Sequence, residues 1–131
     1  MEHKIGVYID TGYGIGEALD IEALSAVATD EFSVAVCKAE PYWNEPDKLA
    51  AIRNDIESES LTAVIIAGPS FRVFQQEFSF GNVITERVNL REHVIWSHPA
   101  NDEDTQMLAE DYLRMGIIKT SKYTDREPFL E

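Results

Sequence analysis

The chain has 131 residues, 44% of them hydrophobic and 27% charged, which is enough for one domain with its own core. Its formal net charge of −13 argues against binding to nucleic acid or to an anionic membrane surface, because both carry negative charge. The single cysteine, Cys37, excludes an internal disulfide and an all-cysteine metal site within one chain. The first ten residues are too charged for a signal peptide and no apolar run reaches membrane length, so we expect a cytoplasmic protein.

The first part of the chain predicts two strands with a helix between them. Residues 4–10 alternate as a strand does, and a glycine-rich turn follows at residues 11–16. Asp20 is placed to cap a short helix. The apolar face of this helix consists of Ile21, Leu24, Val27 and Ala28. A second strand is predicted over residues 32–39, and Pro41 ends it.

The middle of the chain predicts two further strands and their helices. Pro46 fits the first turn of a helix whose buried stripe is Leu49, Ile52 and Ile56. A strand is predicted over residues 61–68, because residues 64–67 form a short continuous apolar run, typical of a strand covered on both faces. Residues 73–80 predict a short helix, and residues 82–88 predict a less apolar edge strand.

The last part of the chain predicts one long helix. Residues 89–98 read as a loop or helical turn, after which Asn101 or Asp102 caps the helix. One apolar face of this helix is predicted to hold Leu108, Tyr112 and Met115, widened by Ala109, Leu113, Ile117 and Ile118. We expect a single domain over residues 1–119 and a C-terminal tail over residues 120–131.

Four strands alternating with helices indicate right-handed crossovers. The predicted fold is therefore α/β, a three-layer sandwich with helices on both faces of an open, mostly parallel four-stranded sheet, flavodoxin-like or Rossmann-like. In such sheets ligands gather beyond the carboxyl ends of the strands, which here means residues 11–16 and residues 69–72.

The glycine-rich turn has two interpretations. Gly12, Gly14 and Gly16 follow a strand and precede a helix, as in a phosphate-binding turn. The spacing is G-x-G-x-G rather than G-x-G-x-x-G, and Glu17 would place a carboxylate near any pyrophosphate. A flavin or nucleotide would sit over Gly12–Gly16 and the 69–72 loop, where Ser70 and Arg72 lie. The other interpretation is a tight turn that needs a permissive backbone.

The other candidate residues in the sequence predict no catalytic or metal site. His93 and His98 are five positions apart, whereas metal-binding pairs on a helix prefer three or four. Ser70 lacks the pattern of a nucleophile elbow, and Cys37 lies mid-strand as a buried thiol. The chain holds more aromatics near strand ends than a small core needs, which indicates either packing or a partner-binding surface. These aromatics are Tyr42, Trp43, Phe71, Phe74, Phe78 and Trp96.

Residues 89–98, Asn-Leu-Arg-Glu-His-Val-Ile-Trp-Ser-His, resemble the segment N-I-R-E-H-C-S-W-V-H in the N-terminal domain of the A subunit of heterodisulfide reductase. The likeness extends over nearly the whole chain. Residues 5–9 resemble that domain's first strand, residues 20–22 its D-V-E, residues 44–46 its S-D-P, residues 67–72 its A-S-C-S-P-R and residues 111–115 its D-L-I-R-M.

In that family the domain precedes an FAD-containing portion, and its cysteines hold an iron–sulfur cluster. The resemblance places other residues at those cysteine positions. They are Asp10, Thr11 or Gly12 for the first pair, and then Trp43, Pro69 and Val94. It therefore implies that thiolate ligation of a four-iron cluster is lost and that FAD binding does not carry over, so we expect no cofactor.

The resemblance also implies what replaces the cluster. Because an empty pocket costs stability, apolar side chains at the former ligand positions are expected to fill it. We therefore expect Trp43, Phe71, Val94 and Trp96 to pack together beyond the strand ends. The predicted partner-binding surface around this former pocket comprises Trp43, Pro69, Phe71, Arg91, His93, Val94 and Trp96.

Two functional hypotheses follow. The first is a non-catalytic docking or assembly module that binds a flavoprotein or iron–sulfur electron-transfer subunit, or that self-associates as a homo-oligomer. The alternative is a small flavin-binding or nucleotide-binding redox module that uses the Gly12–Gly16 loop, with Arg72 and Arg91 contacting phosphate.

Overall fold

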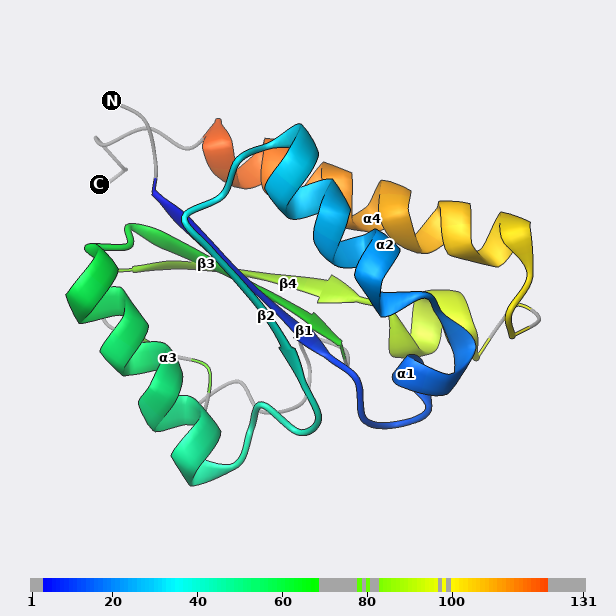
Figure 1. Ribbon diagram of the computed structural model, residues 1–131, viewed down its shortest axis with the longest axis horizontal. Helices are drawn as coiled ribbons and strands as arrows, with labels where there is room; N and C mark the ends of the chain where they lie inside the picture. The colour runs from blue at the N-terminus through cyan, green and yellow to red at the C-terminus, as the bar shows by residue number, and fades with distance from the viewer. Residues whose placement is uncertain are drawn as a thin grey trace, which may run out of the picture.

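The computed structural model describes residues 4–68, 78, 80, 83–96, 98 and 100–122, apart from the side chains of residues 92 and 93. Within this part of the chain, four parallel strands form one sheet in the order β2-β1-β3-β4. The strands are β1 (Ile5–Asp10), β2 (Val36–Glu40), β3 (Ala63–Gly68) and β4 (Ile84–Asn89). Helices lie on both faces of the sheet (Figure 1), which confirms the predicted α/β architecture.

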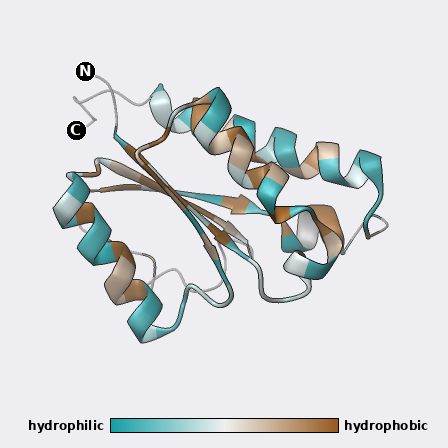
Figure 2. Ribbon diagram, viewed as in Figure 1, coloured by the Kyte–Doolittle hydropathy of each residue, from teal (hydrophilic) through white to brown (hydrophobic). Residues whose placement is uncertain are grey.

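Each face of the sheet has its own hydrophobic core. Helix α3 (Pro46–Glu59) covers one face, and helices α2 (Ile21–Ala26) and α4 (Glu103–Ser121) cover the other (Figure 1). Because side chains alternate along a strand, Val7 of β1 packs on the α2 and α4 side, whereas Tyr8 packs on the α3 side. The central strands β1 and β3 are accordingly buried throughout, whereas the edge strands and the helices mix hydrophobic and hydrophilic residues (Figure 2).

Three helix starts lie where the sequence predicts them. The Asp20 carboxylate accepts a hydrogen bond of 3.1 Å from the Ala23 N–H in α2, and Asp102 accepts one of 2.8 Å from the Asp104 N–H in α4. Pro46 occupies the first turn of α3. The short helix α1 (Ile15–Ala18), within the glycine-rich segment, was not predicted.

The predicted second strand begins too early. Helix α2 continues as a π-helical turn η1 (Val27–Glu31), and Ser33 takes a left-handed φ of 51°, so strand β2 starts only at Val36. The helix predicted over residues 73–80 lies outside the described residues, apart from two isolated positions. Residues 89–98 contain a second π-helical turn, η2 (Arg91–Ile95), as the helical-turn interpretation suggested.

The buried face of α4 also differs from the prediction. Ala109, Leu113 and Ile117 are buried, whereas Met115 and Ile118 are 57% and 41% exposed. A Cβ at Gly116 would lie 2.6 Å from Val88 Cγ2, so this glycine lets α4 approach β4 closely and sets the rotation of the helix. Helix α4 continues to Ser121, two residues beyond the expected domain boundary at 119. No helix among the described residues is both long and apolar enough to cross a membrane.

Candidate functional site

The carboxyl edge of the sheet, between β1 and β3, is the place where strand order reverses. The chain passes from β1 to β2 on one side and later returns to β3 on the other. Such switch points are the usual ligand positions of open parallel sheets. The loop after β1 and the loop after β2 meet here, and their contacts define what the edge presents.

Asp10 ties these two loops together. Its carboxylate is 1% exposed and accepts backbone hydrogen bonds from Gly12 at 2.8 Å, from Tyr42 at 2.9 Å and from Trp43 at 3.3 Å. Three N–H donors compensate the burial of the charge, which would otherwise be costly. Asp10 is therefore a structural anchor of the edge, and its oxygens already have partners.

Trp43 fills the α3 side of the same edge. Its indole Nε1–H donates to the Ile9 carbonyl oxygen at 2.9 Å, and its ring meets the Tyr8 ring edge-on with centroids 5.0 Å apart. The side chain is 1% exposed and belongs to the core beneath α3. The loop after β2 is thus pinned to β1 by both Asp10 and Trp43.

The expected apolar plug of the former cluster pocket is wrong in its described members. Trp43 packs in the core on the α3 side, whereas Val94 packs in the core on the opposite side of the sheet. Trp96 joins neither core and is 65% exposed. Pro69, Ser70, Phe71 and Arg72 lie outside the described residues, as does the His93 side chain.

The backbone conformation and close packing of the first loop require its three glycines. A Cβ at Gly12 would lie 2.6 Å from the Tyr42 ring, and one at Gly16 would lie 2.8 Å from the Thr11 carbonyl oxygen. Gly14 has a φ of 84°, which favours glycine. The Tyr42 ring packs against Gly12 and the Gly12 N–H already donates to Asp10, so these contacts favour the tight-turn interpretation.

An aromatic surface covers the edge above this turn. The Tyr13 and Tyr42 rings meet edge-on with centroids 5.0 Å apart. The Arg91 guanidinium lies 5.1 Å from the Tyr13 ring and 4.9 Å from the Trp96 ring. We call Tyr13, Tyr42, Arg91 and Trp96 the aromatic edge. Arg91 and Trp96 were among the predicted partner-binding residues, and the structure places them next to each other.

The backbone holds the two tyrosines of the aromatic edge in uncommon conformations. Tyr13 and Tyr42 have φ values of 59° and 60°, a left-handed region that bulky residues rarely adopt. The Tyr13 hydroxyl donates to Asn44 Oδ1 at 3.0 Å. Partial burial and the nearby Asp10 charge raise the pKa of Tyr13. Sequence reasoning overlooked Tyr13 and Asn44, although a tyrosine between two glycines was a visible signal.

The residues at this edge do not fit a thiolate-held iron–sulfur cluster. Such a cluster is usually held by four cysteines, and the chain has only Cys37. Cys37 is half-buried on β2, with its thiol 4.0 Å from the Ser25 carbonyl oxygen, and burial raises its pKa. Among the described residues, no group of three His, Cys, Asp or Glu side chains is arranged to hold a metal ion.

Comparison with known proteins identifies relatives of one kind. The chain is 32% identical over 127 residues to the A subunit of the H(2):CoB-CoM heterodisulfide,ferredoxin reductase of Methanothermobacter marburgensis, and 33% identical over 127 residues to that of Methanothermobacter thermautotrophicus. Both matches cover 90% of this chain and 19% of the relative. The chain therefore spans about a fifth of the length of these relatives.

A more distant relative is the A subunit of the ferredoxin/F(420)H(2)-dependent CoB-CoM heterodisulfide reductase of Methanosarcina acetivorans, 28% identical over 88% of this chain and 16% of the relative. No protein-family model matches the chain. The resemblance first seen at residues 89–98 therefore holds for most of the chain, which is 26–33% identical to the A subunits of several heterodisulfide reductases. The chain is homologous to part of the A subunit of heterodisulfide reductases.

Proposed function

We propose that the chain is a non-catalytic docking or assembly module of a heterodisulfide-reductase-like electron-transfer complex. Its partner in this proposal is a flavoprotein or iron–sulfur subunit of such a complex. The observation that carries the proposal is the aromatic edge, where Trp96 is 65% exposed and stacked on Arg91. The names of the relatives, all subunits of heterodisulfide reductases, support a place in a complex of that kind.

The composition of the aromatic edge supports a role in binding protein. Trp, Tyr and Arg are the residues most enriched among those that dominate binding energy at protein interfaces. Arg91 lies between the Tyr13 and Trp96 rings, so the side chains are ordered before a partner arrives. Preordering lowers the entropic cost of association.

The chemistry of the edge supports a binding role over a catalytic one. Asp10, the carboxylate at the switch point, is engaged by three backbone N–H groups. The Tyr42 ring covers Gly12, which weakens the alternative of a flavin or nucleotide bound over this turn. We therefore propose that electron carriers reside in the partner subunit and that this chain contributes a surface.

The test is to purify the tagged chain from its source organism under native conditions and to identify what co-purifies. We expect a subunit with a flavin or iron–sulfur absorption spectrum. With that subunit in hand, Trp96→Ala should weaken binding by about 2 kcal/mol or more, a loss of roughly thirtyfold in affinity.

Arg53 offers a matched control for the aromatic edge. Like Arg91 it lies over an aromatic ring, 5.6 Å from the Phe80 centroid, but it belongs to α3. Arg91→Ala should weaken binding, whereas Arg53→Ala should leave the affinity unchanged. Equal effects of the two substitutions, or the absence of any redox subunit in the purified material, would contradict the proposal.

A further inference from the structure

The solvent-facing side of α4 carries a stripe of exposed apolar and charged side chains. Met107, Met115 and Ile118 are 59%, 57% and 41% exposed, and these three large apolar side chains lie along one side of the helix. Asp104, Asp111 and Lys122 lie between or beside them, with successive members three or four positions apart, so all six share one helix face. We call this set, Asp104, Met107, Asp111, Met115, Ile118 and Lys122, the outer stripe.

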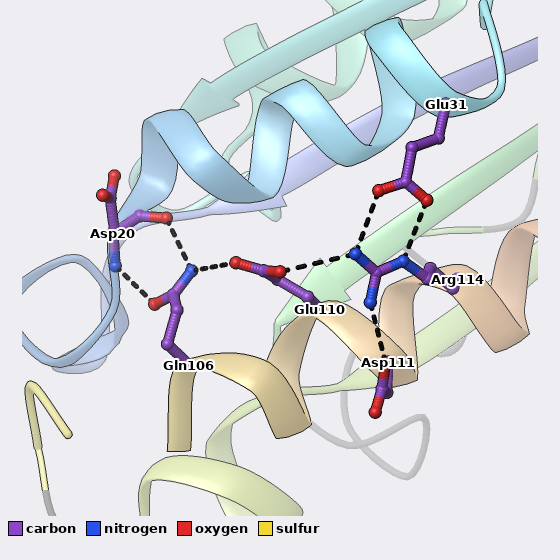
Figure 3. Close-up of polar contacts among 6 residues, drawn as sticks. All are labelled: Asp20, Glu31, Gln106, Glu110, Asp111 and Arg114. Carbon is purple, nitrogen blue, oxygen red and sulfur yellow. Dashed lines mark hydrogen bonds and ion pairs between the residues drawn. The ribbon is translucent and has the colours of Figure 1, made fainter. Parts of the chain in front are cut away.

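Contacts made by Gln106, Arg114 and Gly116, which lie on the other faces of α4, hold the outer stripe away from the core. The Arg114 guanidinium binds both Glu31 oxygens at 2.9 Å and Asp111 at 2.7 Å (Figure 3). Two turns earlier, Gln106 exchanges two hydrogen bonds with the backbone of Asp20, at 2.8 and 3.1 Å (Figure 3). Together with the close approach of Gly116 to β4, these contacts fix how the helix is turned.

The charges along the outer stripe are arranged with opposite signs at its two ends. Asp104 lies at the amino end of α4, beside the acidic Glu103, and Lys122 lies at the carboxyl end with Lys119 one turn before it. The apolar members lie between these ends, together with Asp111, whose carboxylate is paired with Arg114 of the same chain. An antiparallel copy of the same helix would therefore bring acid against base at both ends of the contact, whereas a parallel copy would bring like charges together.

We propose that two copies of this chain associate through their outer stripes, with the two α4 helices antiparallel and related by a two-fold axis. In that pairing Asp104 faces Lys122 of the second copy, and Met107 faces Ile118 of the second copy. Near the axis, Asp111 of each copy faces Met115 of the other copy, as an isologous contact requires. The flexible methionines fit a contact of this kind because they adapt to facing side chains.

The association is weak and depends on concentration. One helix pair buries less surface than a standard interface, and two chains of net charge −13 repel each other. We therefore expect sedimentation velocity of the 131-residue chain, at moderate salt and over a series of concentrations, to show a monomer–dimer equilibrium. Met107→Lys should weaken the dimer at least about tenfold, although it lowers the net repulsion, because it places an ammonium group against Ile118 of the second copy.

Charge exchange tests the antiparallel register. Lys122→Asp should weaken the dimer, and adding Asp104→Lys to it should restore the dimer because acid again faces base. A second double variant, Lys122→Asp with Glu57→Lys on α3, restores the same net charge at a site on the opposite side of the sheet and should not restore the dimer.

Three results would overturn the inference. They are a wild-type chain that stays monomeric over the whole series, a dimer that tolerates Met107→Lys, and equal recovery in the two double variants. Trp96→Ala, which alters the aromatic edge, should leave the dimer unchanged. Dimerisation and docking of a redox subunit can therefore succeed or fail independently.

Discussion

Asp10 shows how one residue can organise the carboxyl edge of a sheet. Its carboxylate is buried at the end of β1 and joins the loop after β1 to the loop after β2 through three backbone N–H groups. Gly68 on the neighbouring strand leaves room for it, since a Cβ there would lie 2.8 Å from the Asp10 Cβ. The placement of Tyr42 and Trp43 thus depends on a carboxylate that binds their backbone rather than their rings.

Asp10→Asn should destabilise the protein without changing the shape of the side chain. The amide replaces one acceptor oxygen by a donor, so at least one of the three backbone N–H groups loses its partner, which costs about 1–3 kcal/mol. Urea unfolding followed by circular dichroism measures the loss. Asp30→Asn, at an exposed position, serves as the control and should change the midpoint little. Equal midpoints for both variants would argue against the anchoring role.

The two tryptophans should report opposite environments. Trp43 is 1% exposed and Trp96 is 65% exposed. In Trp96→Phe the remaining indole should emit at shorter wavelength and resist acrylamide quenching, because water and quencher do not reach Trp43. In Trp43→Phe the remaining indole should emit at longer wavelength and be quenched readily. Similar quenching in the two variants would contradict the burial of Trp43 and the exposure of Trp96.

Sequence reasoning located the edge but not the packing within it. The resemblance drew attention to Trp43, Arg91 and Trp96, and the structure places Arg91 and Trp96 next to each other in the aromatic edge. It failed for Trp43 and Val94, because which face of the sheet a loop residue packs on depends on tertiary contacts such as the hydrogen bond from Trp43 to Ile9. No local pattern in a loop carries that information.

At the scale of elements, local signals predicted where helices begin better than how they are turned. Asp20, Pro46 and Asp102 each act through backbone groups within a few residues, so the sequence shows them directly. The predicted buried face of α4 was centred one residue before the observed one. Because each residue turns a helix by about 100°, this error rotates the predicted face by the same angle. The close contact between Gly116 and Val88, which sets the rotation, joins two elements far apart in sequence.

The Arg114 cluster should make stability depend on pH. The hydrogen bonds from Arg114 lower the pKa of Glu31 below its ordinary value. A lowered pKa in the folded state means that the contribution to stability is complete above the unfolded value of about 4.3 and is lost as the pH falls through the folded value. Unfolding free energies measured from neutral pH down to the acid range should therefore fall more steeply in the wild type than in Arg114→Met.

The comparison with Arg114→Met separates this pair from other carboxylates that titrate in the same range. Arg53→Met should keep the wild-type slope, because Arg53 lies over the Phe80 ring and no ion pair links it to Glu31. Parallel curves for the wild type and Arg114→Met would show that the cluster in Figure 3 contributes nothing that depends on the charge of Glu31.

At the scale of the whole molecule, two surfaces lie on different parts of one small fold. The aromatic edge lies at the carboxyl ends of the strands, and the outer stripe lies on the helix layer formed with α2. The parallel topology and its layers were predictable because hydrophobic periodicity alternates regularly between strand and helix. Neither surface could be predicted from the sequence, since the exposure of a side chain depends on how the assembled layers pack.

The whole chain should carry no chromophore of its own. A four-iron cluster requires several thiolates, and the chain offers only Cys37, whose burial raises its pKa and so disfavours the ligating thiolate. Purified without oxygen, the protein should therefore absorb only in the ultraviolet and contain iron at background level. Titration with FMN or FAD should release no heat, because the Tyr42 ring lies over Gly12.

Each contrary result would identify a different error. A yellow protein that releases flavin on denaturation would revive the flavin-binding alternative, and Tyr42→Ala should then alter the affinity. A brown protein with stoichiometric iron would require ligands beyond one thiolate, and Cys37→Ser would decide whether two chains share a cluster through Cys37. Because colour, iron content and heat are measured on the unmodified chain, these results bear on the cofactor without depending on the identity of any partner.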